Sequence, residues 1–157
     1  MSHSVCVSMG GMMTGAAPTV LETVGVGSCL VIVINDPIAK VGGLAHAMLP
    51  SVFEGGSHNA VGERSRYVDA AVDAMVEALL SAGARKDRLV ARLVGGAHMF
   101  TLYGGVENGI GFRNLTQARC TLKQVGIPVM AEETGGTVGR NVRFDLASGI
   151  CSVETHM

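Results

Sequence analysis

The sequence lacks several features that mark common classes of protein. Its 12 basic and 13 acidic residues give a formal net charge of −1, so no electrostatic footprint for nucleic acid or anionic lipid is present. The longest apolar run, Leu30 to Ile34, is too short to cross a bilayer, and no signal peptide is recognised. We therefore expect a soluble, cytoplasmic protein that binds no nucleic acid and inserts into no membrane.

Cysteines and histidines are few and scattered. The four cysteines include no C-x-x-C pair, and a chain of 157 residues with its own core needs no disulfide framework, so reduced thiols are expected. No pair among the cysteines and the five histidines has the spacing of zinc ligands. We expect neither a structural metal nor a cofactor. Cys6, Cys120 and Cys151 have no further context and are interpreted as core or helix-surface residues.

Hydrophobic residues, by contrast, are abundant. They make up 48% of the chain, which is enough for one compact domain over residues 1–157 with its own core. The 22 glycines fall in small clusters, a pattern typical of turns and close backbone approaches at strand ends. No domain boundary is visible, and residues 51–62 have the composition of a mobile surface loop.

The hydrophobic pattern predicts two helices and seven or eight strands. From Ser65 to Ala82 apolar residues recur on one helical face, and Gly83 is a suitable C-terminal stop. A second helix is expected from about Gly111 to a cap at Gly126. Strands are expected at 5–9, 19–24, 29–35, 41–49, 88–94, 128–132, 141–146 and 150–154, the last two forming a hairpin. Together these elements predict an α+β, single-domain layered sandwich with a mixed β-sheet and about two helices.

The best candidate for chemistry is a cysteine on a glycine-rich turn. Cys29 follows Gly25-x-Gly27-Ser28 and opens the buried run that begins at Leu30. Glycines allow unusual backbone angles there and leave N–H groups free, while the strand holds the sulfur in place. His46 lies in the next strand, which the reversal at 36–37 brings alongside the first. We expect the two side chains to form a Cys–His pair in which the sulfur is a thiolate.

Each of these residues also has an ordinary structural interpretation. Cys29 alone would be a small buried hydrophobe, and His46 alone a satisfied core histidine. Thr23 is by default a β-former, but it becomes the orienting member of a triad if it accepts a hydrogen bond from the second ring nitrogen of His46. Gly25-x-Gly27 superficially resembles a dinucleotide fingerprint. The third glycine is missing and a β-branched run follows where a helix must open, so this function is excluded.

Two further strand-end turns carry polar residues. They contain Gly95 and Gly96 in one case, and Glu132 with its neighbours 133–136 in the other. They are either simple turns or walls of the same pocket, and we include Gly27, Ser28, Gly95, Gly96 and Glu132 as possible pocket residues. His98 is a rival imidazole, expected to be exposed beyond its glycine turn. Arg140 is a candidate ion-pair partner for Glu132 or Glu133.

With these residues identified, the chain resembles the chemoreceptor glutamine deamidases of the CheD family. His98 and Glu133 depart from that pattern, since the family often has a small polar residue at the first position and aspartate at the second. The resemblance covers nearly the whole chain. Its matching segments are 23–29, 36–37, 43–50, 66–71, 95–97, 99–100, 111–114, 131–136 and 139–140.

The resemblance implies a hydrolase, a protein-glutamine glutaminase that converts glutamine side chains of methyl-accepting chemotaxis receptors to glutamate. It implies that Cys29 is the nucleophile of a thioester pathway, His46 the base and Thr23 the orienting residue. It also implies a fold similar to the catalytic domain of the cytotoxic necrotizing factor toxins. The partners it implies are chemoreceptor cytoplasmic domains and a CheC-type phosphatase. The alternatives are a non-catalytic interaction module that binds receptors or that phosphatase, and a thiol peptidase, which needs an open cleft.

Overall fold

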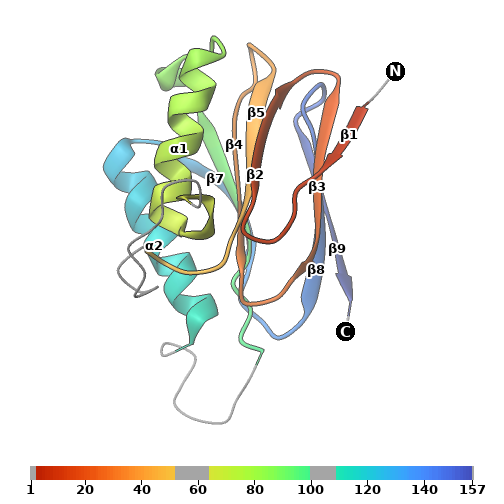
Figure 1. The fold of residues 1–157 in the computed structure, drawn as a ribbon, viewed down its shortest axis with the longest axis vertical. Coiled ribbons are helices and arrows are strands. Elements are labelled where there is room, and N and C mark those ends of the chain that lie inside the picture. Colours follow the sequence, from red (N-terminus) through yellow and green to blue (C-terminus); the bar gives the residue numbers. More distant parts are fainter. Residues whose placement is uncertain (1–2, 52–63, 100–108, 157) are drawn as a thin grey trace.

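The fold is a three-layer arrangement of two helices and two β-sheets. A computed structural model describes residues 3–51, 64–99 and 109–156. Figure 1 shows both helices on one face of a five-stranded sheet and a four-stranded sheet on its other face. The strands of the described residues are β1 (His3–Cys6), β2 (Met12–Ala16), β3 (Thr19–Val26), β4 (Leu30–Asp36), β5 (Val41–Ala47), β6 (Val90–Gly95), β7 (Val129–Thr134), β8 (Gly139–Asp145) and β9 (Ile150–His156).

The two sheets differ in strand order and composition. The five-stranded sheet has the order β2-β5-β4-β6-β7, and all its pairs are antiparallel except β6 with β7, which are joined through a helix. The four-stranded sheet has the order β1-β3-β8-β9, with only β1 and β3 parallel. The predicted α+β layered sandwich with mixed sheets is therefore confirmed.

Strand β4 lies at the centre of the molecule and is buried on both faces. Leu30, Ile32 and Ile34 pack into the core beneath the helices, whereas Val31 and Val33 pack into the core between the sheets. Because successive side chains of a strand point to opposite faces, a strand covered on both sides needs apolar residues at every position. This explains the unbroken run of Leu, Val and Ile in the sequence.

Both expected helices are present. Helix α1 (Val68–Ser81) follows the short 3₁₀ turn η1 (Arg64–Arg66), so the expected start at residue 65 is a separate turn before the helix. Helix α2 (Ile110–Val125) ends at Gly126, whose φ of 78° gives the left-handed cap that the sequence predicts. A second 3₁₀ turn, η2 (Lys86–Arg88), precedes β6 and replaces the first residues of the strand expected at 88–94.

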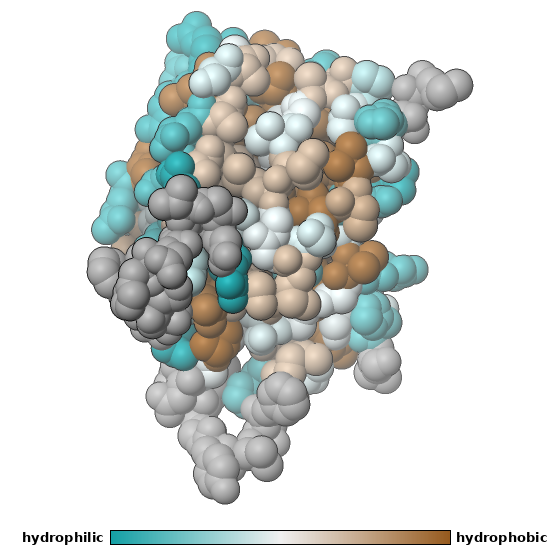
Figure 2. Space-filling view, viewed as in Figure 1, coloured by the Kyte–Doolittle hydropathy of each residue, from teal (hydrophilic) through white to brown (hydrophobic). Residues whose placement is uncertain are grey.

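The N-terminal strands differ from the expectation. The strand expected at 5–9 is β1 at His3–Cys6, and the Gly/Met-rich segment interpreted as a loop contains β2. Its five residues, MMTGA, have weak strand propensity, but β2 forms an edge of the five-stranded sheet and pairs there with β5, with Gly15 opposite Gly42. Figure 2 shows pale and brown residues over this edge, and hydrophilic residues over the helices. The loop expected at 51–62 lies outside the described residues, except for Ser51.

No helix among the described residues is both long enough and apolar enough to cross a membrane.

The predicted reversal at Asp36-Pro37 is confirmed, since β4 ends at Asp36 and β5 begins at Val41. The hairpin expected around Ser148-Gly149 is also present between β8 and β9.

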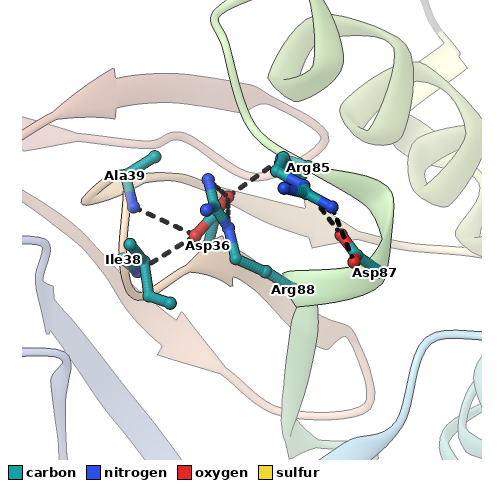
Figure 3. A network of polar contacts seen from close by, with 6 residues as sticks. All are labelled: Asp36, Ile38, Ala39, Arg85, Asp87 and Arg88. Atoms are coloured by element: carbon teal, nitrogen blue, oxygen red, sulfur yellow. Dashed lines mark hydrogen bonds and ion pairs between the residues drawn. The ribbon is translucent and has the colours of Figure 1, made fainter.

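A buried carboxylate fixes the reversal after β4 and joins it to η2 (Figure 3). The Asp36 side chain is fully buried and accepts hydrogen bonds from the backbone N–H groups of Ile38, Ala39 and Arg85 at 2.9–3.0 Å. The Arg88 guanidinium adds an ion pair at 3.0 Å. Burial alone would raise the pKa of Asp36, but these four donors outweigh it and hold the pKa at about 2.

We predict that the Asp36 network makes the fold sensitive to acid. The folded-state pKa of about 2 lies below the ordinary 3.8, so its contribution to stability is present above pH 4 and is lost as the pH falls toward 2. A difference of this size corresponds to roughly 2 kcal/mol. Urea unfolding of the Asp36→Asn variant should show a large loss of stability at pH 6 that shrinks by about this amount at pH 2.5.

Asp87→Asn is the matched control. Asp87 pairs with Arg85 in the same network at 3.0 Å, but its side chain is 67% exposed. An exposed pair is worth about 0–1 kcal/mol, so this variant should remain close to the parent at both pH values. A pH-independent loss in Asp36→Asn would contradict the proposed titration.

Candidate active site

A β-bulge directly follows Thr23 in β3. Thr23 pairs with Val142 of β8, and Val26 pairs with Arg140. Three steps along β3 therefore match two steps along β8, so β3 contains one extra residue. Without it, Thr23 and Val26 would face opposite sides of the sheet, whereas both are in fact buried. Gly25 adopts φ of +70° in the bulge, a conformation that strongly favours glycine. Thr23 points into the core because it follows the buried Leu21 by two residues in regular pairing with β8, and the bulge brings Val26 to the same face.

Thr23 links the two sheets through His46 on β5. The Thr23 hydroxyl oxygen lies 2.7 Å from Nδ1 of His46 and 2.6 Å from the carbonyl oxygen of Val7. A hydroxyl has a single proton, and only Thr23 can donate in the contact with the Val7 carbonyl. It must therefore accept from His46, so Nδ1 carries the ring proton. The expected hydrogen bond from the second ring nitrogen to Thr23 is present. Its direction follows from the bond that the Thr23 hydroxyl donates to the Val7 carbonyl.

This tautomer leaves Nε2 of His46 with a free lone pair. Nε2 is buried and has no hydrogen-bond partner among the described residues. His46 lies directly opposite Val31 on β4, and Cys29 is two residues before Val31. Cys29 directly precedes β4, whose first residue, Leu30, pairs with Ala47, the residue after His46. The structure thus brings the nucleophile and base candidates to the same end of β4 and β5.

The charge state of the pair differs from the expectation. Burial raises the pKa of the Cys29 thiol, opposed only in part by its own backbone N–H. Burial also lowers the pKa of the His46 imidazole. Both effects disfavour ions, because desolvation penalises the charged form of either group. These directions favour a neutral Cys29 thiol and a neutral His46 imidazole in the free protein over the expected thiolate–imidazolium pair.

The loop that carries Cys29 is hydrogen-bonded to the segment at the end of β6. Gly96 N–H donates to the Cys29 carbonyl at 2.8 Å, and Ala97 N–H donates to the Gly27 carbonyl at 3.0 Å. Gly95, at φ of +114°, allows this approach, since a Cβ atom there would lie 2.5 Å from the Cys29 carbonyl oxygen. Gly27, Gly95 and Gly96 therefore all lie around the Cys29 loop.

Asn114 is a residue of this site for which the sequence predicted no separate role. It is fully buried on α2, and its Nδ2 donates to the carbonyls of Ser28 at 3.0 Å and Met48 at 3.2 Å. Ser28 is thus also placed beside the helix. The sequence does contain a signal for such a role. Asn114 is a polar residue at a position of the apolar helical face, next to Leu115 and one turn before Ala118.

Glu132 lies within β7 and not in the turn that the sequence predicts, and its contacts are elsewhere. Glu132 forms a two-bond ion pair with Arg119 on α2, at 2.6 and 3.0 Å. It lines a cavity of about 220 Å³ bordered by Cys151 and others, and none of Thr23, Cys29 and His46 lines that cavity. The contacts of Glu132 therefore do not place it beside Cys29.

The remaining candidates near the turn have structural contacts. Glu133 pairs with the buried Arg140 at 3.6 Å, which is one of the two pairings that the sequence left open. Arg140 also donates to the Gly95 carbonyl at 3.4 Å and so connects β8 to the end of β6. His98 is half-buried rather than exposed, and its backbone N–H donates to the Gly136 carbonyl at 2.8 Å.

All four cysteines are free thiols. Cys120 is exposed on α2, in agreement with the expected helix-surface position. Cys151 is half-buried and packs against the core between the sheets, where burial raises the pKa of its thiol. Cys6 is exposed on the edge strand β1, so it is neither a core nor a helix residue. Of the four, Cys29 is the one that directly precedes β4, the strand paired with the strand of His46.

Comparison with known proteins identifies related sequences over nearly the whole chain. The family described as CheD chemotactic sensory transduction matches residues 48–155. A probable chemoreceptor glutamine deamidase CheD of Desulfitobacterium hafniense is 42% identical over 156 residues, covering 99% of this chain and 95% of the relative. The corresponding CheD 3 of Geobacter sulfurreducens is 40% identical, covering 98% and 94%. One from Pyrococcus abyssi is 39% identical, covering 95% and 90%.

We predict that His46 is neutral, protonated at Nδ1, and titrates below the ordinary histidine pKa of 6.5. Long-range ¹H–¹⁵N NMR distinguishes the two tautomers, and His46→Gln assigns the signals. Because the unfolded chain takes up the proton first as the pH falls below 6.5, the free energy of unfolding should decrease with falling pH in this range. The His46→Gln variant should lack that component. A ring protonated at Nε2 at pH 7.5 would contradict the hydrogen-bond chain.

Proposed function

Since this chain belongs to the CheD family, we propose that it is a chemoreceptor glutamine deamidase that works through Cys29, His46 and Thr23. The observation that supports this most directly is the hydrogen-bonded chain from Val7 through Thr23 to His46. It leaves one imidazole nitrogen free near the end of β5, which pairs with the start of β4 directly after Cys29. A nucleophile, a base and a group that orients the base are the parts that acyl transfer requires.

The first half of the reaction transfers the acyl group to sulfur. Nε2 of His46 accepts the proton of the Cys29 thiol as the sulfur attacks the carboxamide carbon of a glutamine side chain. The carbonyl oxygen becomes an oxyanion, and the backbone N–H of Cys29 is a donor close to that position. The C–N bond then breaks, the imidazolium returns its proton to the leaving nitrogen, and ammonia departs. A thioester on Cys29 remains.

The second half hydrolyses the thioester. Water gives a proton to Nε2 of His46 as its oxygen attacks the thioester carbon. The C–S bond breaks, Cys29 recovers the proton, and the product is glutamate. Throughout, Thr23 holds the ring so that the same nitrogen faces the reacting atoms. A neutral hydroxyl stabilises imidazolium less than a carboxylate does, which suits a slow, regulatory enzyme.

The substrate class follows from the relatives and from the geometry of glutamine. The relatives are named as acting on chemoreceptors, so the cytoplasmic domains of such receptors are the proposed substrates. A glutamine side chain projects from a helix on rotatable bonds, whereas the backbone amides of a helix are hydrogen-bonded and screened. Asparagine is one methylene shorter, which is worth roughly 1–3 kcal/mol of discrimination. We further propose that the enzyme is cytoplasmic and binds a CheC-type phosphatase.

One assay separates this function from its alternatives. The purified protein is incubated with a receptor cytoplasmic fragment, and released ammonia is measured together with the mass of each receptor peptide. Deamidation releases ammonia and adds about 1 Da per site, which follows from replacing NH₂ by OH. A non-catalytic interaction module leaves the receptor mass unchanged, and a thiol peptidase shortens the receptor. Either of these two results would overturn the proposal.

We predict that Cys29→Ala abolishes deamidation and leaves the fold intact. Alanine fills the half-buried thiol position without strain, whereas loss of the nucleophile in a coupled triad costs on the order of 10⁴-fold or more. Ammonia release and the melting temperature are the two measurements. Cys6→Ala and Cys120→Ala remove exposed thiols and serve as matched controls with parental rates. Comparable activity in Cys29→Ala would show that another group is the nucleophile.

We predict that Thr23 contributes less than the two reacting residues. Thr23→Ala removes the hydroxyl that relays between Val7 and His46 but leaves the sulfur and the imidazole in place. One orienting hydrogen bond suggests a loss in kcat/KM of roughly 10- to 100-fold, which is about 1.4–2.7 kcal/mol. Thr23→Ser keeps both hydrogen bonds and should retain most activity. If Thr23→Ser is as inactive as Thr23→Ala, the orienting role of the hydroxyl is wrong.

A further inference from the structure

We infer that Asn114 is a positioning residue that sets the geometry between Cys29 and His46 from outside the triad. This inference rests on the proposed function and adds a member to its site. Asn114 lies on α2, whereas Cys29 and His46 belong to the loop before β4 and to β5. Asn114 therefore contacts both segments from a helix, outside the sheet.

The two hydrogen bonds of Asn114 reach the neighbours of the reacting residues. Nδ2 donates to the carbonyl of Ser28, which is joined by its peptide bond to Cys29. The same nitrogen donates to the carbonyl of Met48, two residues after His46. The two bond lengths are 3.0 and 3.2 Å, so one amide group holds both segments at a common point. The distance between these segments is thereby tied to one side chain.

The orientation of the Asn114 amide is determined by its partners. Both partners are carbonyl oxygens, which accept and cannot donate, so an amide rotated by 180° would place its own oxygen against two acceptors. Only the NH₂ group can face Ser28 and Met48. Its two N–H bonds match the two acceptors in number. No other uncharged side chain of this size supplies two donors from one atom.

The bond to Ser28 also orients the backbone N–H of Cys29. In a trans peptide the C=O of one residue and the N–H of the next point in opposite directions. Because Asn114 draws the Ser28 carbonyl toward α2, the Cys29 N–H is directed away from the helix. That N–H lies close enough to the sulfur to lower the pKa of the thiol, against the larger effect of burial. Asn114 thus orients a candidate oxyanion donor as well as the sulfur.

Packing alone does not account for an asparagine at this position. Its side chain is fully buried in a mostly apolar stripe whose other members are Gly111, Leu115, Ala118, Thr121 and Leu122. Its Oδ1 atom is buried and has no hydrogen-bond partner among the described residues. A buried acceptor without a partner destabilises a fold. A polar group kept in an apolar stripe at this cost points to a role at the site.

The test measures the reactivity of Cys29 apart from turnover. Iodoacetamide alkylation at pH 7 is followed by mass spectrometry of the Cys29 peptide, in the parent, Asn114→Ala, His46→Gln and the double variant. We expect Asn114→Ala to slow alkylation about tenfold, because Nε2 no longer lies where it accepts the thiol proton. In the His46→Gln background the same substitution should have no further effect. Asn114→Asp keeps the size of the side chain and removes both donors at pH 7, so it should behave like Asn114→Ala.

Two residues of the same helix supply matched controls. Thr121 is also a buried polar residue of α2, and Leu122 is a fully buried apolar one. Thr121→Ala and Leu122→Ala should lower the melting temperature and leave Cys29 alkylation at the parental rate. The inference is overturned if Asn114→Ala slows alkylation no more than these controls do. It is also overturned if the loss is the same with and without His46, since the effect is then a general loosening of the structure.

Deamidation kinetics give a second measurement. Asn114→Ala should lower kcat by at least tenfold and change KM by less than threefold, because Asn114 contacts the backbone of the site and not the substrate. A raised KM with an unchanged kcat would overturn the positioning role. If the parent protein shows no deamidation at all, the proposed function fails. The alkylation experiment still decides whether Asn114 couples Cys29 to His46.

Discussion

The single proton of the Thr23 hydroxyl determines the chemistry available at this site. Because that proton goes to the Val7 carbonyl, the imidazole of His46 must donate from Nδ1 and keep its lone pair on Nε2. A threonine without the carbonyl would accept or donate equally well, and the tautomer would be undetermined. A backbone carbonyl therefore determines the tautomer of the histidine here, a role that a carboxylate has in many triads. The regular pairing of β3 with β8 up to Thr23 points the hydroxyl inward, on the same face as the buried Leu21.

The proposed catalytic residues lie at a junction of the two sheets. Thr23 comes from the four-stranded sheet, and His46 and Cys29 come from β5 and the start of β4 in the five-stranded sheet. Strand β4 is rigid because it is buried on both faces, so it holds the loop that carries Cys29. The glycine pair at the end of β6 and Asn114 of α2 hold the same loop from two other directions. Four elements, β3, β4, β6 and α2, therefore orient the groups of the site, and they meet only in the folded state.

Burial gives the Cys–His pair its electrostatic character. The interior disfavours both the thiolate and the imidazolium, so the resting pair is neutral. In the proposed mechanism, proton transfer from Cys29 to Nε2 then accompanies attack on the substrate. A neutral thiol is a poor nucleophile toward adventitious electrophiles, and this restricts reaction to a carboxamide that is correctly placed beside Nε2 and the N–H of Cys29. The same burial makes the fold lose stability as His46 is forced to take up a proton in acid.

Local patterns in the sequence were sufficient to predict the helices, the central strands and the turn at Asp36-Pro37. They also singled out Cys29 and His46 as candidates. Periodicity, caps and a glycine turn are properties of neighbouring residues, so they can be read without the fold. The edge strand β2 was missed because its weak propensity is overcome by pairing with β5. The tautomer of His46, the neutral pair and the contacts of Asn114 were decided only by the tertiary structure. Each depends on atoms far apart in the chain and on how completely water is excluded from them, and no local pattern records either.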